Sequence, residues 1–392
     1  MFVKCIKLSV LASLLLSSSL FSNDGFDEDE FSSDELIEVV KIEKKDDLTI
    51  YGSLTGSADY SYQDKHTISS SKLSTNIKLE YVLDESNKIK TTFKAYKDNQ
   101  TNKDNDQYVD FNELILESTF SNGIDTKFGR QIVVWGKSDN IRITDILNPM
   151  DNTRPGMVDI EDLRLGRAMT KLDYYINNNW AVSGILLHEN RYSLMPELGS
   201  DYYMPLPIPN APSNSIANTG IALSANANFE GQDIAFYYSN QYIDNTNYKS
   251  NMIGTAYNKV IDSFLIKTEL AYFDNYDTSL VDSKIDSLIG LEYNGIDEGS
   301  ISIEIANKDD EIQYAVRYTQ SFFNQTLDLT TLYSGFGKEL DGGGFLRAWF
   351  EYDIDDSFST EFGVISYQGG TKTNFELIKN NDRLFTSLKY SF

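Results

Sequence analysis

The feature that most constrains this chain is an alternation of apolar and polar residues, repeated in segments of about ten residues. Leu270 and Tyr272 show it, and the same pattern recurs in the segments 48–62, 73–83, 285–293 and 384–392. Side chains of a strand alternate between its two faces, whereas a helix would repeat its apolar positions every ~3.6 residues. A segment of this length is also what a tilted strand needs to cross a bilayer. The alternation therefore predicts strands with one apolar face.

The complete pattern predicts an all-β, antiparallel, up-and-down transmembrane β-barrel of about eighteen strands. We place the strands near 48–62, 71–83, 87–97, 108–120, 123–135, 164–177, 179–189, 216–229, 231–241, 248–259, 262–274, 283–294, 298–308, 311–320, 324–334, 342–353, 357–368 and 383–392. Sixteen strands remain an alternative, because short links such as 308–310 can be placed differently. Residues 369–382 could hold extended hairpin arms.

The links between these segments alternate in length. Short turns such as 84–86 and 354–356 are interleaved with mostly longer links. Outer-membrane barrels have short periplasmic turns and longer outer loops. We therefore expect both termini on the short-turn, periplasmic side.

The N-terminus predicts export. Lys4 and Lys7 precede a short apolar run, 8–16, and small residues follow it, as in a secretory signal peptide over 1–22. Cys5, the one cysteine, lies before the apolar run, so the mature chain would contain none. Residues 23–47 form an acidic segment, which we interpret as a periplasmic tail. Together these features predict a Gram-negative outer-membrane location, with membrane lipids around residues 48–392.

Composition excludes several classes of function. The formal net charge is −25, which argues against nucleic acid as a partner. One cysteine and two histidines exclude a zinc or iron–sulfur site built from clusters of Cys and His, and we expect no cofactor. His66 and His188 lie outside recognisable catalytic motifs, so an enzyme is not expected. The acidic run 98–106 offers calcium-type oxygen ligands, but without a binding-loop spacing it is better explained as a solvated loop.

The last residues carry a second signal. Tyr390 and Phe392 close an alternating strand with a terminal aromatic residue. This ending resembles the C-terminal signal that the barrel-assembly machinery of Gram-negative bacteria reads. The resemblance implies that this machinery is a partner of the chain.

Two links are much longer than the others, 136–163 and the proline-rich 190–215. In a barrel wide enough to hold water, a long loop that folds inward narrows the pore. The first link and its flanks concentrate charge, and we take these residues as candidates for a pore constriction: Arg130, Lys137, Asp139, Arg142, Asp145, Asp151, Arg154, Arg164 and Arg167. Opposed charges could create a transverse field that selects permeants. Equally, they could hold the loop by salt bridges without affecting flow.

Arg130 poses a problem of register. It shares strand parity with Ile124, Phe128 and Ile132, which belong to the apolar face. A lipid-facing arginine at the middle of the membrane would cost ~2–4 kcal/mol. Arg130 therefore lies near the rim, or a bulge turns it toward the lumen, and we expect the break in register.

The same region resembles a known family. Phe128-Gly129-Arg130-Gln131, Trp135-Gly136 and Asn148-Pro149 are similar to the Gly-Arg-Gln, Trp-Gly and Asn-Pro signature of a family of porin-like outer-membrane proteins. That family is related in layout to alginate-export and phosphate-selective porins. The resemblance implies a barrel that passes a small or amphiphilic solute, and it names no substrate.

The sequence therefore favours a porin-like channel for passive passage of small solutes, with the loop at about 136–163 as its constriction. The alternatives are a non-transporting structural or adhesive surface barrel, and a secreted soluble β-sandwich. The acidic balance predicts a preference for cations. Monomer and trimer are both open.

Overall fold

The computed structural model describes residues 47–392 except 64, 100–106, 122, 206–207 and 278–280. The chain divides into two units, 1–45 and 46–392. The predicted signal peptide and nearly all of the predicted acidic tail lie outside the described residues, as does most of the acidic run 98–106. Everything below concerns the second unit.

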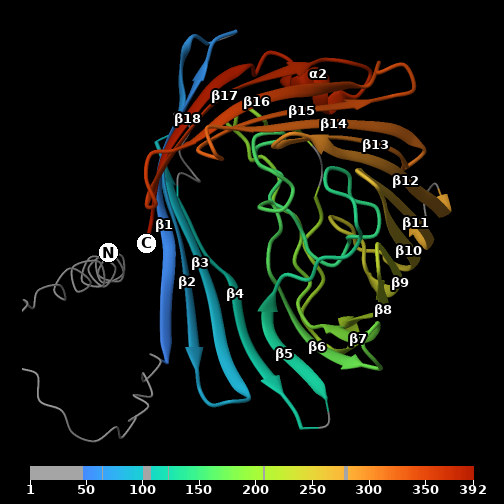
Figure 1. Ribbon diagram of the computed structural model, residues 1–392. Helices are drawn as coiled ribbons and strands as arrows, with labels where there is room; N and C mark the ends of the chain where they lie inside the picture. Colours follow the sequence, from blue (N-terminus) through green and yellow to red (C-terminus); the bar gives the residue numbers. More distant parts are fainter. Residues whose placement is uncertain (1–46, 64, 100–106, 122, 206–207, 278–280) are drawn as a thin grey trace, which may run out of the picture. The chain divides into compact units, whose positions relative to one another are not determined.

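The second unit is a closed antiparallel β-barrel of eighteen strands (Figure 1). The strands are β1 Leu48–Ser61, β2 Thr67–Val82, β3 Asn87–Asp98, β4 Gln107–Thr119, β5 Ile124–Gln131, β6 Arg167–Tyr175, β7 Trp180–Leu187, β8 Gly220–Phe229, β9 Gln232–Tyr242, β10 Lys249–Ile261, β11 Phe264–Asp277, β12 Val281–Ile296, β13 Gly299–Lys308, β14 Glu311–Phe322, β15 Leu327–Phe336, β16 Gly343–Asp353, β17 Phe358–Gln368 and β18 Arg383–Ser391. Each strand pairs with its sequence neighbours, and β18 pairs with β1. The predicted fold class and the count of eighteen, rather than sixteen, are confirmed.

The alternation of the sequence becomes the two faces of the wall. In β13 the side chains of Ile303 and Ile305 are exposed on the outside, and Glu304 between them is buried inside. In β11, Leu270 and Tyr272 are exposed, while Glu269 and Ala271 are enclosed. An apolar outer face around a polar interior is the arrangement of membrane-spanning barrels. Among the described residues, no helix has the length and apolar character needed to cross a membrane.

The barrel closes where its two ends meet. The backbone of Phe392 both donates to and accepts from the backbone of Gly52 in β1, at 3.0 and 2.9 Å. Tyr390 packs its ring against Phe358, with ring centroids 4.9 Å apart. Both ends of the barrel therefore lie on the short-turn side, as expected, and the terminal aromatic residues belong to the seam. Their reading by assembly machinery stays a prediction.

Gly52 offers a test of this seam. A Cβ added there would lie 2.5 Å from the carbonyl oxygen of Asn76, so strand β1 would have to shift. We expect Gly52→Ala to destabilise the closed barrel by ~1–3 kcal/mol, seen as a lower melting point of the folded band in semi-native gel electrophoresis. Gly56→Ala is the matched control, since no atom lies within 4 Å of a Cβ there. Equal melting of the two variants would contradict the close approach at Gly52.

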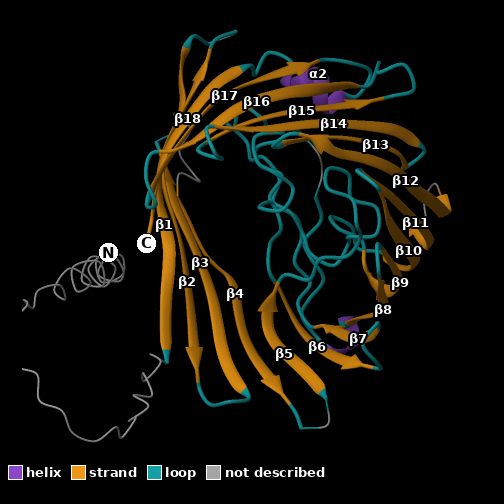
Figure 2. Cartoon of the chain, viewed as in Figure 1, coloured by secondary structure: helices purple, strands orange, loops and turns teal. Residues whose placement is uncertain are grey.

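Several predicted boundaries differ from the structure. Strand β5 ends at Gln131 rather than 135, and β6 begins at Arg167 rather than 164. Residues Ile216–Asn218, predicted as strand, form the 3-10 turn η1. The link before β18 contains the short helix α2, Thr373–Ile378, and no extended hairpin arms (Figure 2). Phe375 of α2 packs on Phe336 of β15, with centroids 4.9 Å apart.

Candidate pore constriction

Residues 132–166, which we call the crossing segment, connect β5 to β6 and run inside the barrel wall (Figure 2). They contact interior side chains of strands far from β5 in the sequence, including Tyr237 of β9 and Glu269 of β11. The segment is therefore positioned by the opposite wall and not only by its own two strands.

Glu269 is the first anchor of the crossing segment. Its carboxylate accepts backbone N–H groups from Lys137 (2.6 Å), Ser138 (2.8 Å) and Thr144 (3.0 Å), and the Thr144 hydroxyl at 2.8 Å. The Glu269 side chain is buried, with 3% of the residue exposed. Hydrogen bonds to an ionised carboxylate are about twice as strong as neutral ones. One glutamate thus fixes both ends of a tight loop.

Glu304 is the second anchor. It accepts the backbone N–H groups of Asp139 (2.7 Å), Asn140 (3.0 Å) and Ile141 (3.0 Å). It is 1% exposed and lies on β13. Two interior carboxylates therefore hold the backbone of 137–144 against the wall.

The turn between β5 and the residues held by Glu269 and Glu304 requires glycine. Gly136 has a φ of +84°, and a Cβ there would lie 2.7 Å from a Glu269 carboxylate oxygen. Its N–H donates to the Tyr237 hydroxyl at 3.1 Å. Trp135 stacks on the same tyrosine ring, with centroids 4.7 Å apart. The Trp-Gly pair of the sequence signature thus docks the segment on β9.

A buried charge cluster organises the middle of the segment. Asp145 accepts the Nε–H groups of Arg142 (3.1 Å) and Arg164 (2.9 Å), and the backbone N–H of Trp135 at 3.3 Å. Burial lowers the pKa of the Arg142 guanidinium, and the Asp145 carboxylate acts in the opposite direction. Three of the predicted constriction residues therefore pair within the segment, where two guanidinium groups share one carboxylate.

Asn148 explains why β5 and β6 end early. Its side-chain oxygen accepts the N–H of Val133 at 2.8 Å, and its amide donates to the carbonyls of Gln131 (3.1 Å) and Leu165 (2.9 Å). These side-chain bonds replace the ladder between the two strands. The Asn of the Asn-Pro motif therefore splits the strand pair and releases the crossing segment.

The far part of the segment reaches the other side of the barrel. Asp159 pairs with Arg317 of β14 and Arg347 of β16, each at 3.0 Å. Arg154 pairs with Asp59 of β1. The carbonyl of Pro155 accepts the Tyr367 hydroxyl of β17 at 2.6 Å. The segment is thus fastened from β9 around to β1.

Arg130 lies elsewhere than predicted. The expected break of register in β5 is wrong, because Arg130 pairs with Leu114 in a regular ladder. It is the last but one residue of β5, and its guanidinium pairs with Asp110 (3.0 Å) and Glu189 (2.5 Å). The nearby pair β3 and β4 does have a register shift, between Thr92 and Phe93. At the end of β5 the charge of Arg130 is stabilised by ion pairs with Asp110 and Glu189, so the arginine does not face lipid unpaired.

The structure places the other predicted residues at different points around the crossing segment. Arg167 is buried and donates to the Leu147 carbonyl (3.3 Å) and the Gln241 side chain (2.5 Å), so it supports the segment from β6. Lys137 lies 3.6 Å from Asp233. Asp139 pairs with Lys267. Asp151 and Arg154 line a cavity.

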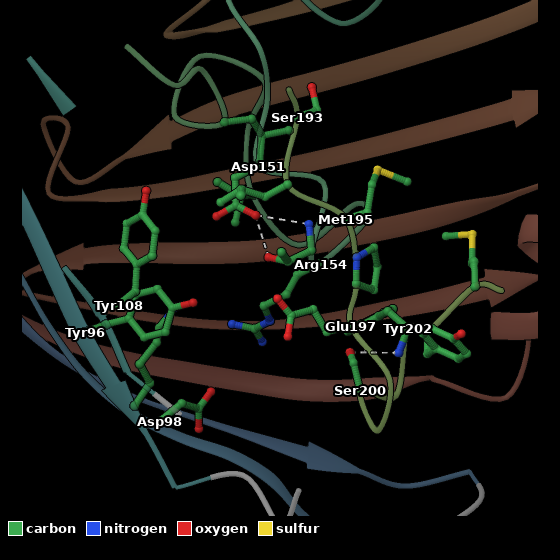
Figure 3. A pocket seen from close by; sticks show the side chains of 18 of the residues that line it. Tyr96, Asp98, Tyr108, Asp151, Arg154, Ser193, Met195, Glu197, Ser200 and Tyr202 are labelled. Carbon is green, nitrogen blue, oxygen red and sulfur yellow. Dashed lines mark hydrogen bonds between the residues drawn. The ribbon is translucent and has the colours of Figure 1, made fainter. Parts of the chain in front are cut away.

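This cavity, which we call the loop-side cavity, has a volume of about 550 Å³ and lies between the wall of β2–β4 and the two long loops (Figure 3). Tyr96, Asp98 and Tyr108 project from the wall, and Asp151 and Arg154 face them from the crossing segment. Residues of the second long loop complete it, from Ser193 to Met204 together with Ile208. The cavity is the space that the two loops leave open next to the wall.

Sequence reasoning missed the residues that hold the loops. Glu269 and Glu304 are single carboxylates at interior positions of alternating strands, and nothing in the local pattern separates them from other polar residues. Asp201 in the second loop was also missed, although it pairs with Lys65 and lies 3.5 Å from Arg383.

A family model described as a protein of unknown function, DUF1302, matches residues 35–302, more than half of the chain. The chain belongs to this family. No curated protein matches the chain. The predicted links to alginate-export and phosphate-selective porins are not tested by the family match and stay predictions.

Solved structures show the same fold. Acinetobacter baumannii OccAB4 aligns with a TM-score of 0.57 at 11% identity, covering 88% of this chain and 98% of that one. Acinetobacter baumannii OccAB3 gives 0.56 at 12%, covering 88% and 99%. Salmonella typhi OmpF in complex with daunomycin gives 0.50 at 12%, covering 88% and 97%. At these identities the likeness concerns the fold alone, which is porin-like.

Proposed function

We propose that this chain is a porin-like outer-membrane channel that passes small solutes passively, with residues 136–163 as its constriction. The observation that carries the proposal is the fastening of the crossing segment to the interior wall by Glu269 and Glu304. Backbone held by buried carboxylates keeps a fixed place in the lumen, where it reduces the open cross-section. The loop-side cavity then belongs to the remaining path.

The proposal includes an orientation. The short turns lie on the periplasmic side, and the two long loops leave their strands at the opposite, outer end of the barrel, the layout of outer-membrane barrels. The chain is exported by its cleaved signal peptide, and the assembly machinery reads Tyr390 and Phe392. Lipids of the outer membrane cover the apolar outer face.

A solute-uptake assay tests the function. Liposomes that contain the purified full-length protein are expected to swell in an isotonic solution of a small sugar, and to swell faster with a variant lacking residues 139–160. Swelling of neither preparation above that of empty liposomes would contradict the proposal. That result would favour the non-transporting surface protein.

The charge of the path predicts its selectivity. The loop-side cavity is lined by four carboxylates, those of Asp98, Asp151, Asp162 and Glu197, against the two cations Lys72 and Arg154. We therefore expect reversal potentials in a salt gradient to show a cation preference, because a net negative constriction enriches cations. Reversal potentials that indicate anion preference would contradict this assignment of the path.

A further inference from the structure

The loop-side cavity has one aromatic and one apolar side. Tyr96 of β3 and Tyr108 of β4 stack with centroids 5.4 Å apart and planes at 20°. The loops contribute aliphatic and thioether side chains to the lining: Val158, Leu163, Leu194, Met195, Pro196 and Met204. Its volume falls in the range of small-molecule sites, ~300–1,000 Å³. The cavity is therefore suited to the apolar body of a small molecule.

The charges of the cavity are unevenly paired. Arg154 is neutralised by Asp59. Lys72 stands opposite Asp98 in the β2–β3 register, and its ammonium lies 5.2 Å from the centre of the Tyr96 ring. The cations of the cavity thus already have anionic or aromatic neighbours.

Three carboxylates of the cavity lining form no direct ion pair with a described basic residue: Asp151, Asp162 and Glu197. Asp151 accepts bonds only from the backbone and hydroxyl of Thr153, at 3.0 and 2.5 Å, in the part of the chain that the structure describes. Asp162 and Glu197 are exposed. The unpaired charge of the cavity is therefore negative.

We propose that the loop-side cavity binds small organic cations that carry an apolar body, such as aromatic amines, on their way through the barrel. The position on the solute path rests on the proposed channel function, whereas the binding itself does not. The ammonium group would be placed near the unpaired carboxylates and the face of a tyrosine ring, where cation–π attraction adds to the ion pair. The apolar body would displace water from the aliphatic side.

An aromatic carboxylate of the same size has no such place. It would meet the three carboxylates that form no ion pair, and of the two cations Arg154 is paired with Asp59 while Lys72 lies against the Tyr96 ring. Comparing an amine with an acid of equal shape therefore isolates the charge preference. A neutral alcohol of the same shape measures the apolar contribution alone.

Ligand-observed NMR on the purified full-length protein in detergent micelles tests the binding, with benzylamine, benzoate and benzyl alcohol as probes. Benzylamine is expected to bind most tightly and benzoate least. The double variant Asp162→Asn, Glu197→Gln is expected to weaken benzylamine about tenfold, since two exposed ion-pair contacts are lost. Glu161→Gln, a neighbouring exposed carboxylate outside the cavity lining, is the matched control.

The aromatic side has its own variants. Because Tyr96 already stacks on Tyr108 and lies against the Lys72 ammonium, the variants are placed at Tyr108, which also lines the cavity. Tyr108→Ala is expected to weaken benzylamine about threefold, and Tyr108→Phe to restore binding, because the ring face and not the hydroxyl makes the contact. The proposal is overturned if benzoate binds as tightly as benzylamine, or if the double variant binds benzylamine like the control.

Block of ion current separates this inference from the channel itself. In planar bilayers benzylamine is expected to interrupt the current. The double variant is expected to require an about tenfold higher benzylamine concentration for the same block. Benzylamine binding without any channel current would leave the binding site standing and overturn the channel. Channel current with no preference for benzylamine over benzoate would overturn the binding site and leave the channel standing.

Discussion

Replacing Glu269 and Glu304 together by glutamine is expected to increase single-channel conductance. Each carboxylate accepts three backbone N–H groups of the crossing segment, and a glutamine presents an amide N–H₂ to part of that donor set. A buried donor left without a partner costs ~1–3 kcal/mol. With several donors affected, the segment between 137 and 144 should leave the wall and widen the path.

Glu351→Gln provides the matched control for conductance. Its carboxylate shares the interior parity of Trp349 on β16 and accepts no hydrogen bond from the described part of the crossing segment. This single variant is expected to conduct like the unaltered protein. If the double variant at Glu269 and Glu304 conducted like Glu351→Gln, these glutamates would not hold a constriction.

Asp145→Asn is expected to have the largest effect on the stability of the segment. The change leaves the buried guanidinium groups of Arg142 and Arg164 without their shared counter-charge. Removing one partner from a buried ion pair costs ~3–5 kcal/mol. Because the wall keeps its own strand ladder, the loss should appear as local opening, measured by the rate of protease cleavage within 132–166.

Glu161→Gln is the control for this variant. Its side chain is exposed in the same segment, so cleavage should match that of the unaltered protein. Unchanged protection of Asp145→Asn would show that the charge cluster does not stabilise the segment. Cleavage spread over the strands would indicate that the whole barrel depends on it.

The barrel could be predicted because its signal is local. Outward residues such as Ile303 and Ile305 repeat every second position, and closure of the ring follows from antiparallel neighbours. The exact ends could not be predicted, since β5 is terminated by Asn148, seventeen residues beyond its last residue, Gln131. Periodicity contains no information about such a contact.

The sequence indicated which charged residues are concentrated near the candidate site, but not which of them pair with one another. Charge concentration directed attention to the crossing segment, but Arg142 and Arg164 both donate to Asp145 within that segment. Their mutual burial supports the reading in which salt bridges hold the loop. The charges that line open space, Asp151 and Arg154, could be separated from them only in three dimensions.

A thiol-blocking experiment tests whether the crossing segment narrows a channel through the barrel. The only cysteine is Cys5, so a Cys5→Ser, Thr153→Cys protein carries one thiol in the loop-side cavity. We expect the current steps in planar bilayers to fall when a bulky thiol reagent modifies position 153, and to stay unchanged for the exposed control Glu339→Cys outside the cavity. Current that is unaffected by modification at 153, or absent even after residues 139–160 are deleted, would contradict a channel narrowed by the crossing segment.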